Sequence, residues 1–68
     1  MAERTFHVMG LDENSEEQIA RILNAINGVD GVHASKDENT IRIELDEDVP
    51  DEMLRAAVEG AGIRVVDS

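Results

Sequence analysis

Two kinds of side chain are missing or nearly missing from this sequence. It contains no cysteine, tryptophan or tyrosine, and Phe6 is its only aromatic residue. Without thiols the chain cannot form a disulfide, a thiolate zinc or iron–sulfur site, or a cysteine nucleophile. Without aromatic side chains it has no platform on which nucleobases could stack. Composition alone therefore excludes several classes of cofactor site and of nucleic-acid site.

Basic residues are scarce as well. Six Lys and Arg stand against 16 Asp and Glu, so the formal net charge is −10, and Lys36 is the only lysine. Such a surface repels nucleic-acid phosphates and anionic membranes, and we expect neither as a partner. Two origins would explain the acidity: a halophilic source, in which carboxylates keep a protein soluble in concentrated salt, or deliberate design of a strongly charged surface. Composition leaves both open.

Long hydrophobic runs are absent too. No apolar stretch approaches the roughly 18 residues that a membrane span requires, and the start MAERTF has neither the basic nor the apolar region of a secretory signal. The 68 residues allow one small domain, residues 1–68, with no linker. We therefore expect a soluble, cytoplasmic, single-domain monomer.

Alternation of apolar and polar residues predicts four strands. In the first, Phe6 and Val8 share one face. The second and third form a hairpin around the polar turn KDEN, and Ile41, Ile43 and Leu45 of the third face the core. The strands are expected in RTFHVMG (4–10), VHAS (32–35), TIRIEL (40–45) and IRVV (63–66).

Two stretches with helical periodicity lie between these strands. In SEEQIARILNAING, Ser15 and Gln18 match a capping box, and Gly28 is placed to end the helix. The second helix follows Pro50, which suits a first turn, and ends at the glycines near residue 60. The apolar faces are expected to be Ile19, Ile22, Leu23 and Ile26 in the first helix, and Met53, Leu54, Ala57 and Val58 in the second.

The predicted order is βαββαβ, which indicates an α+β, ferredoxin-like fold. In this fold a four-stranded antiparallel sheet carries two helices on one face. A single core should then form between the sheet and the helices. We expect it to contain Phe6, Val8, Ile19, Ile22, Leu23, Ile41, Ile43, Leu54 and Val58.

Three stretches, distributed in order over residues 5–65, resemble segments of one known family. They are TFHVMGL, INGVDGVHAS and IRIELDEDVPDEMLRAAVEGAGIRV. Together they resemble the first strand, the helix end with its Gly-Val pair, and the second half of a heavy-metal-associated, copper-chaperone-like domain. The resemblance implies a ferredoxin-like fold, binding of soft metal ions, and transfer of the metal to a partner domain.

The sequence departs from this family at the metal loop. The family has Met-x-Cys-x-x-Cys there, whereas this chain has LDENSE: Leu11 replaces the methionine, and Glu13 and Glu16 replace both cysteines. The aromatic or lysine that the family often has in the late loop corresponds to Ile63. Cu(I) prefers thiolates, and carboxylates suit hard ions. The resemblance therefore implies the scaffold without its copper chemistry.

A hard cation is one alternative for the loop. Asp12, Asn14 and Glu16 alternate as at the start of a calcium-binding loop, but Glu17 stands where that loop needs glycine. Acidic residues at a helix start are favoured by the helix dipole without any metal. We interpret this stretch as a solvated helix N-terminus.

Histidine and methionine offer other potential ligands. His7 and His33 with a carboxylate could form a zinc site, and Met9, next to the loop, could supply a thioether. Nothing in the spacing demands either site. We predict no metal site and no cofactor, and we keep Glu13, Glu16, His7 and Asp12 as the candidates if a metal binds.

Catalysis is not expected. His33, Ser35 and Asp37 alternate along one predicted strand, and side chains in line do not converge as a catalytic triad requires. Acylphosphatases share this fold class, but their phosphate-binding loop and its arginine have no counterpart here. The remaining candidate surface is the open face of the sheet. We expect it to display Thr5, His7, Met9, Arg42 and Glu44.

The sequence thus supports three interpretations of function. The first is a non-catalytic interaction or regulatory domain of heavy-metal-associated type with a degenerate metal loop and an unnamed protein partner. The second is a sequence engineered onto this scaffold without a biological function, which consistent caps, stops and patterning would suit. The third is a metal-binding protein with oxygen and nitrogen ligands around Glu13, Glu16 and His7.

Overall fold

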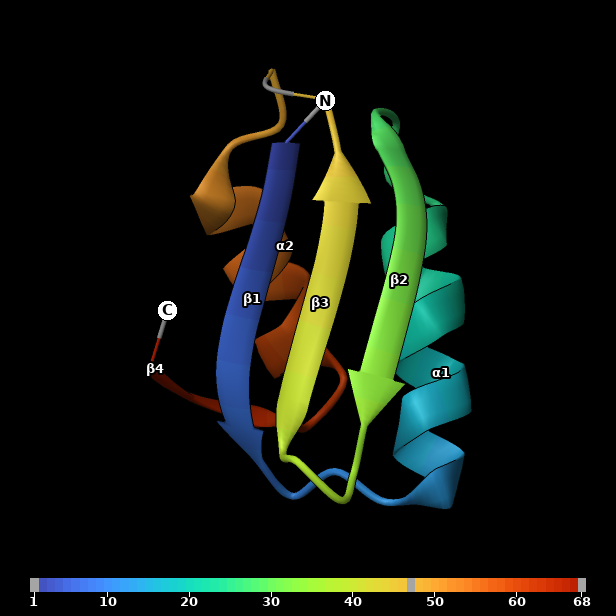
Figure 1. Cartoon of the computed structure of the whole chain (residues 1–68), viewed down its shortest axis with the longest axis vertical. Coiled ribbons are helices and arrows are strands. Elements are labelled where there is room, and N and C mark those ends of the chain that lie inside the picture. The colour runs from blue at the N-terminus through green and yellow to red at the C-terminus, as the bar shows by residue number, and fades with distance from the viewer. Residues whose placement is uncertain (1, 47, 68) are drawn as a thin grey trace.

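The computed structural model describes residues 2–46 and 48–67 and has the predicted βαββαβ order. The sheet order is β2-β3-β1-β4, and every neighbouring pair is antiparallel. Both helices lie on the same face of the sheet (Figure 1), which confirms the ferredoxin-like α+β architecture. The elements are β1 (Ala2–Met9), α1 (Glu13–Asn24), β2 (Val29–Ser35), β3 (Thr40–Leu45), α2 (Asp51–Gly60) and β4 (Arg64–Asp67).

The core lies between the sheet and the two helices. Alternate residues of β1 and β3 enter it, and the helices contribute residues one turn apart. The prediction for Ile22 is wrong: this side chain is only half-buried, because it lies on the flank of the stripe formed by Ile19 and Leu23. The buried cluster comprises Phe6, Val8, Leu11, Ile19, Leu23, Ile41, Ile43, Leu45, Val49, Leu54, Val58 and Ile63.

Helix α1 begins earlier than the predicted capping box. Its N-cap is Asp12, whose Oδ1 accepts a hydrogen bond from the Ser15 backbone N–H at 2.8 Å. Ser15 therefore lies inside the first turn and does not cap the helix. Aspartate is at least as good an N-cap as serine, and its negative charge also interacts favourably with the helix dipole.

The end of α1 also differs from the prediction. The helix stops at Asn24, before Gly28, and Gly28 instead leads into β2 with a φ of 99°. A Cβ at this position would lie 2.6 Å from Cγ2 of Val49. Glycine is thus required both by the backbone conformation and by the close approach of the loop between β3 and α2.

Helix α2 contradicts one core assignment. Leu54 and Val58 are fully buried, but Met53 is 49% exposed and is not core filler. Met53 lies in the first turn of the helix and lines a hollow beside the loop that precedes it. Pro50 is the N-cap itself, with extended backbone, and precedes the first turn. Within residues 2–46 and 48–67, neither helix has the length and apolar character needed to cross a bilayer.

The degenerate metal loop and the open sheet face

The loop between β1 and α1 is short. Gly10 turns the chain with a φ of 89°, and Leu11 then enters the core, where it is 9% exposed. The residue at the family's methionine position is therefore a packing residue. Asp12 follows as the helix cap, and the first turn carries the two glutamates that replace the thiols.

Asp12 is held by the helix that it caps. Hydrogen bonds from Ser15, above all from its backbone N–H, keep the pKa of the Asp12 carboxyl below its ordinary value. The ionised form is the one that accepts these bonds, so the cap favours a charged Asp12. This carboxylate is thereby engaged in starting α1.

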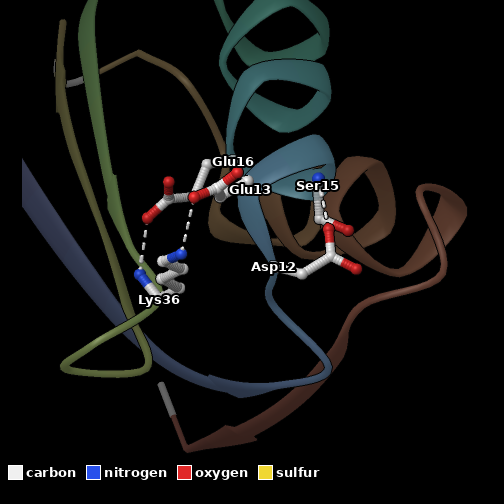
Figure 2. A network of polar contacts seen from close by, with 5 residues as sticks. All are labelled: Asp12, Glu13, Ser15, Glu16 and Lys36. Carbon is white, nitrogen blue, oxygen red and sulfur yellow. Dashed lines mark hydrogen bonds and ion pairs between the residues drawn. The ribbon is translucent and has the colours of Figure 1, made fainter.

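Lys36 engages the other two carboxylates of the loop. Its Nζ donates to Glu13 Oε1 at 3.0 Å, and its backbone N–H donates to Glu16 Oε2 at 2.6 Å (Figure 2). Lys36 opens the turn between β2 and β3, so these two bonds join the start of α1 to the hairpin. We call this arrangement the Lys36 tie.

The donor set of the loop does not fit Cu(I). Its side chains offer carboxylate, amide and hydroxyl oxygens, which suit hard ions, and the Lys36 ammonium beside Glu13 has no lone pair to give. Among the residues described, no three histidine, aspartate or glutamate side chains converge as metal ligands would. The chain's only lysine instead supplies a positive charge beside Glu13 and Glu16.

The two histidines lie elsewhere. His7 is opposite Thr40 in the β1–β3 register and alternates with buried Phe6 and Val8. It therefore projects from the face of the sheet that the helices leave open, whereas Glu13 and Glu16 belong to α1 on the other face. His33 lies on β2, where its Nε2 is 3.3 Å from Glu44 Oε1.

The open face brings together the predicted interaction residues. Thr5 is opposite Arg42, and Glu3 is opposite Glu44. Arg42 and His33 lie beside the two glutamates, with Arg42 Nε 3.8 Å from Glu3 Oε2. Of the five residues predicted for this surface, four are exposed and one, Glu44, is half-buried. The exposed residues are Thr5, His7, Met9 and Arg42.

A shallow hollow of about 370 Å³ lies on this face. Its lining includes Glu3, Ser35 and Thr40, which the predicted surface omitted. Strand alternation places Glu3 and Thr40 on the polar face of their strands, so this signal was present in the sequence. The contribution of β2 depends on the register between the strands, which the sequence does not state.

His33, Ser35 and Asp37 do not form a catalytic unit. His33 contacts Glu44, and the Ser35 hydroxyl accepts a hydrogen bond from the Glu38 backbone N–H at 3.3 Å. A triad requires the nucleophile and the base to be bonded to each other. Their arrangement is that of a polar outer face running into a turn.

Comparison with solved structures identifies proteins that have the same fold. No family model matches the sequence, and no curated protein matches it. The CopZ metallochaperone superposes with a TM-score of 0.92 at 21% identity, covering 96% of this chain and 100% of that chain. A copper binding domain from HMA7, a P-type ATPase, gives 0.90 at 20% identity, covering 100% and 95%. A chain of the Atx1–Cu(I)–Ccc2a complex gives 0.79 at 23% identity, covering 97% of both.

These likenesses extend over essentially the whole length of each chain, but the sequence identities are low. At such identities the agreement establishes the fold, and the ligands in the metal loop have to be read from this chain itself. The chain therefore has the fold of copper-chaperone-like, heavy-metal-associated domains, as the resemblance of its sequence implied, with carboxylates in place of both thiols.

Proposed function

We propose that this chain is a non-catalytic interaction domain that keeps the copper-chaperone fold and has lost its copper site. The observation that carries this proposal is the Lys36 tie. Both carboxylates at the former thiol positions are bonded to Lys36, one through Nζ and one through the backbone N–H. A loop used in this way joins α1 to the hairpin and no longer presents ligands for a soft metal.

The open face of the sheet is the proposed interaction surface. It combines exposed polar and charged side chains with Met9, whose side chain is 58% exposed. Exposed methionine suits a contact surface because the side chain is flexible and apolar. A chain of the Atx1–Cu(I)–Ccc2a complex has this fold, and this likeness supports a protein partner. A cytoplasmic location and a monomeric state stay predictions.

Metal binding by oxygen and nitrogen ligands is the competing function. It would have to recruit Glu13 and Glu16 away from Lys36, and Asp12 away from its cap. His7 could contribute only from the open face of the sheet. This alternative is therefore tested by asking whether the loop takes up a metal at all.

Amide NMR titrations with Cu(I), Zn²⁺ and Ca²⁺ test the proposal. In the unmodified chain we expect small, unsaturated shifts spread over the acidic residues, since carboxylates bonded to Lys36 attract only a diffuse counterion cloud. Saturable shifts confined to residues 11–16 at micromolar metal would overturn the proposal and favour the metal-binding alternative.

A double variant, Glu13→Cys with Glu16→Cys, provides the matched control. It restores two thiolates at the spacing Cys-x-x-Cys on an unchanged scaffold. We expect this variant to bind Cu(I) saturably, because thiolates are the ligands that this ion prefers. Failure of the folded variant to bind Cu(I) would mean that the loop differs from a metal loop in more than its ligands.

A further inference from the structure

A second surface lies at the end of the molecule opposite the metal loop. The α1–β2 loop and the loop between β3 and α2 both lie at this end (Figure 1), where the Asp46 backbone N–H donates to the Gly28 carbonyl at 2.7 Å. Residues of these two loops and of α2 line an open hollow of about 280 Å³. This volume is at or below the lower end for small-molecule pockets, and it suits one or two side chains of a partner. The lining consists of Asn27, Gly28, Asp46, Asp48, Val49, Pro50 and Met53.

The apolar part of the lining of this hollow consists of Val49, Pro50 and Met53. Met53 is 49% exposed there, although it lies on a helix whose neighbouring Leu54 is fully buried. Val49 lies against Gly28, where a side chain in place of the glycine hydrogen would collide with it. The absence of a side chain at Gly28 thus lets the two loops approach each other closely.

The rim of the hollow is acidic. Asp46 and Asp48 line it, and in the part of the chain that the structure describes neither carboxylate forms an ion pair. Arg21, Lys36 and Arg42 pair with carboxylates elsewhere, and Arg4 pairs with Asp51, the residue that follows Pro50. Between Arg42 and Arg55 the sequence contains no basic residue. Among the described residues, no ion pair therefore neutralises Asp46 or Asp48.

We propose that this hollow docks a basic segment of a partner protein through an arginine or lysine side chain. Such side chains have an apolar stem and a charged head. The stem would lie on Met53 and Pro50, and the head would lie between Asp46 and Asp48. The hollow thus supplies an apolar contact for the stem and carboxylates for the charged head. In addition, the net charge of −10 attracts a cationic partner from a distance. The inference concerns a different surface and does not depend on the open-face proposal.

The test uses a capped tetrapeptide of alternating arginine and leucine, titrated into the chain and followed by amide NMR at about 0.15 M salt, where long-range attraction is screened. We expect saturable shifts at Gly28, Asp46, Asp48 and Met53. The same peptide with citrulline in place of arginine keeps the shape and loses the charge, and it should not saturate.

Variants separate docking from general attraction. Asp46→Asn with Asp48→Asn should weaken peptide binding about fivefold or more, since two exposed ion pairs are lost. The matched control is Asp37→Asn with Glu38→Gln, which makes the same charge change at the hairpin turn and should leave binding unchanged. Met53→Ala should also weaken binding, and Met9→Ala should not.

Three results would overturn the inference. Equal loss of binding in the Asp46/Asp48 variant and in the Asp37/Glu38 variant would mean that net charge alone attracts the peptide. Unsaturated shifts over all acidic residues would have the same meaning. Shifts at Thr5, Met9 and Arg42 would assign the peptide to the open face and leave the hollow without this role. None of these results depends on metal binding by the loop, so the two proposals fail separately.

Discussion

Asp12 and Gly28 each decide a local feature of the molecule. Asp12 sets the first residue of α1, because its carboxylate satisfies a backbone N–H that the helix leaves free. This start places Glu13 and Glu16 within reach of Lys36. Gly28 allows the two loops at the other end to approach closely. Each effect follows from one residue, and each can be tested by one substitution.

The first prediction concerns the pH dependence of the Asp12 cap. The pKa of Asp12 is lowered in the folded chain from an ordinary value of 3.8. Its contribution to stability is therefore fully present above that value and is lost as the pH falls through the lower, folded pKa. Asp12→Asn keeps a capping oxygen but cannot titrate. Urea unfolding should show the two proteins differing at neutral pH and becoming more alike in acid.

This comparison cancels the effect of the other carboxylates. Their protonation reduces self-repulsion in both proteins by similar amounts, so the difference between the two proteins reports mainly on Asp12. A difference in the free energy of unfolding that stays constant across the whole pH range would contradict the prediction.

The second prediction concerns Gly28→Ala. The substitution forces a non-glycine residue to a φ of 99° and brings its Cβ against Val49. We expect a loss of about 1–3 kcal/mol in the free energy of unfolding. Gly62→Ala is the control, since Gly62 has a φ of 85° but no atom within 4 Å of its Cβ position. Equal losses at both glycines would show that backbone strain acts alone and that contact with Val49 adds nothing.

At the scale of elements, α1 is held to the sheet in two ways. Ile19 and Leu23 are fully buried against it, and the Lys36 tie joins its first turn to the hairpin. Burial of a large apolar side chain contributes about 1.5–3 kcal/mol, whereas an exposed ion pair contributes about 0–1 kcal/mol. Packing therefore provides most of the attachment, and the tie orients the loop.

The third prediction follows from this packing. Leu23→Ala should cost about 2–5 kcal/mol, because it leaves a cavity under α1. Ile22→Ala on the same helix should cost less, since Ile22 is only half-buried. Thermal or urea unfolding of both variants provides the measurement. A larger loss at Ile22 than at Leu23 would mean that the apolar stripe of α1 is rotated from the position described.

The fourth prediction concerns the Lys36 tie. Lys36→Met removes the ammonium that pairs with Glu13 but keeps the backbone N–H that donates a hydrogen bond to Glu16. The free energy of unfolding should therefore fall by less than about 1 kcal/mol. A double-mutant cycle with Glu13→Gln isolates the ion pair. A coupling of several kcal/mol would show that the tie is a major source of stability as well as a positioning contact.

At the scale of the whole molecule, the main feature is the excess of negative charge. The chain measures 28 × 21 × 19 Å and has a net charge of −10. At an ionic strength of 0.01 M the Debye length is about 30 Å, so every charge acts on every other, whereas at 1 M it is about 3 Å. The folded state therefore experiences a self-repulsion that salt can remove.

The fifth prediction is that the free energy of unfolding rises steeply between dilute buffer and molar NaCl. Urea unfolding at several salt concentrations measures it. A domain of this size has little stability in reserve, so a halophilic sequence should depend on this screening. High stability already in dilute buffer, with little change on adding salt, would instead favour the interpretation as an engineered sequence.

The fold could be predicted from the sequence because its signals are periodic and local. Alternation in β1 and β3, helical spacing in α1 and α2, and turn residues between them specify the elements and hence the βαββαβ order. The carboxylates at positions 13 and 16 were likewise evident from the sequence. The misassigned Ile22 and Met53 lie at the margins of apolar faces, where periodicity does not specify which side chain is covered.

Tertiary structure decided what those residues do. The contact of Lys36 with Glu13 and Glu16 spans about twenty positions along the chain and depends on how the hairpin turn packs beside α1. The pairing of His33 with Glu44 depends on strand register, and the hollow beside Met53 depends on two loops meeting over Gly28. Local propensity cannot encode such contacts, because they form only when segments distant in sequence are brought together by the core.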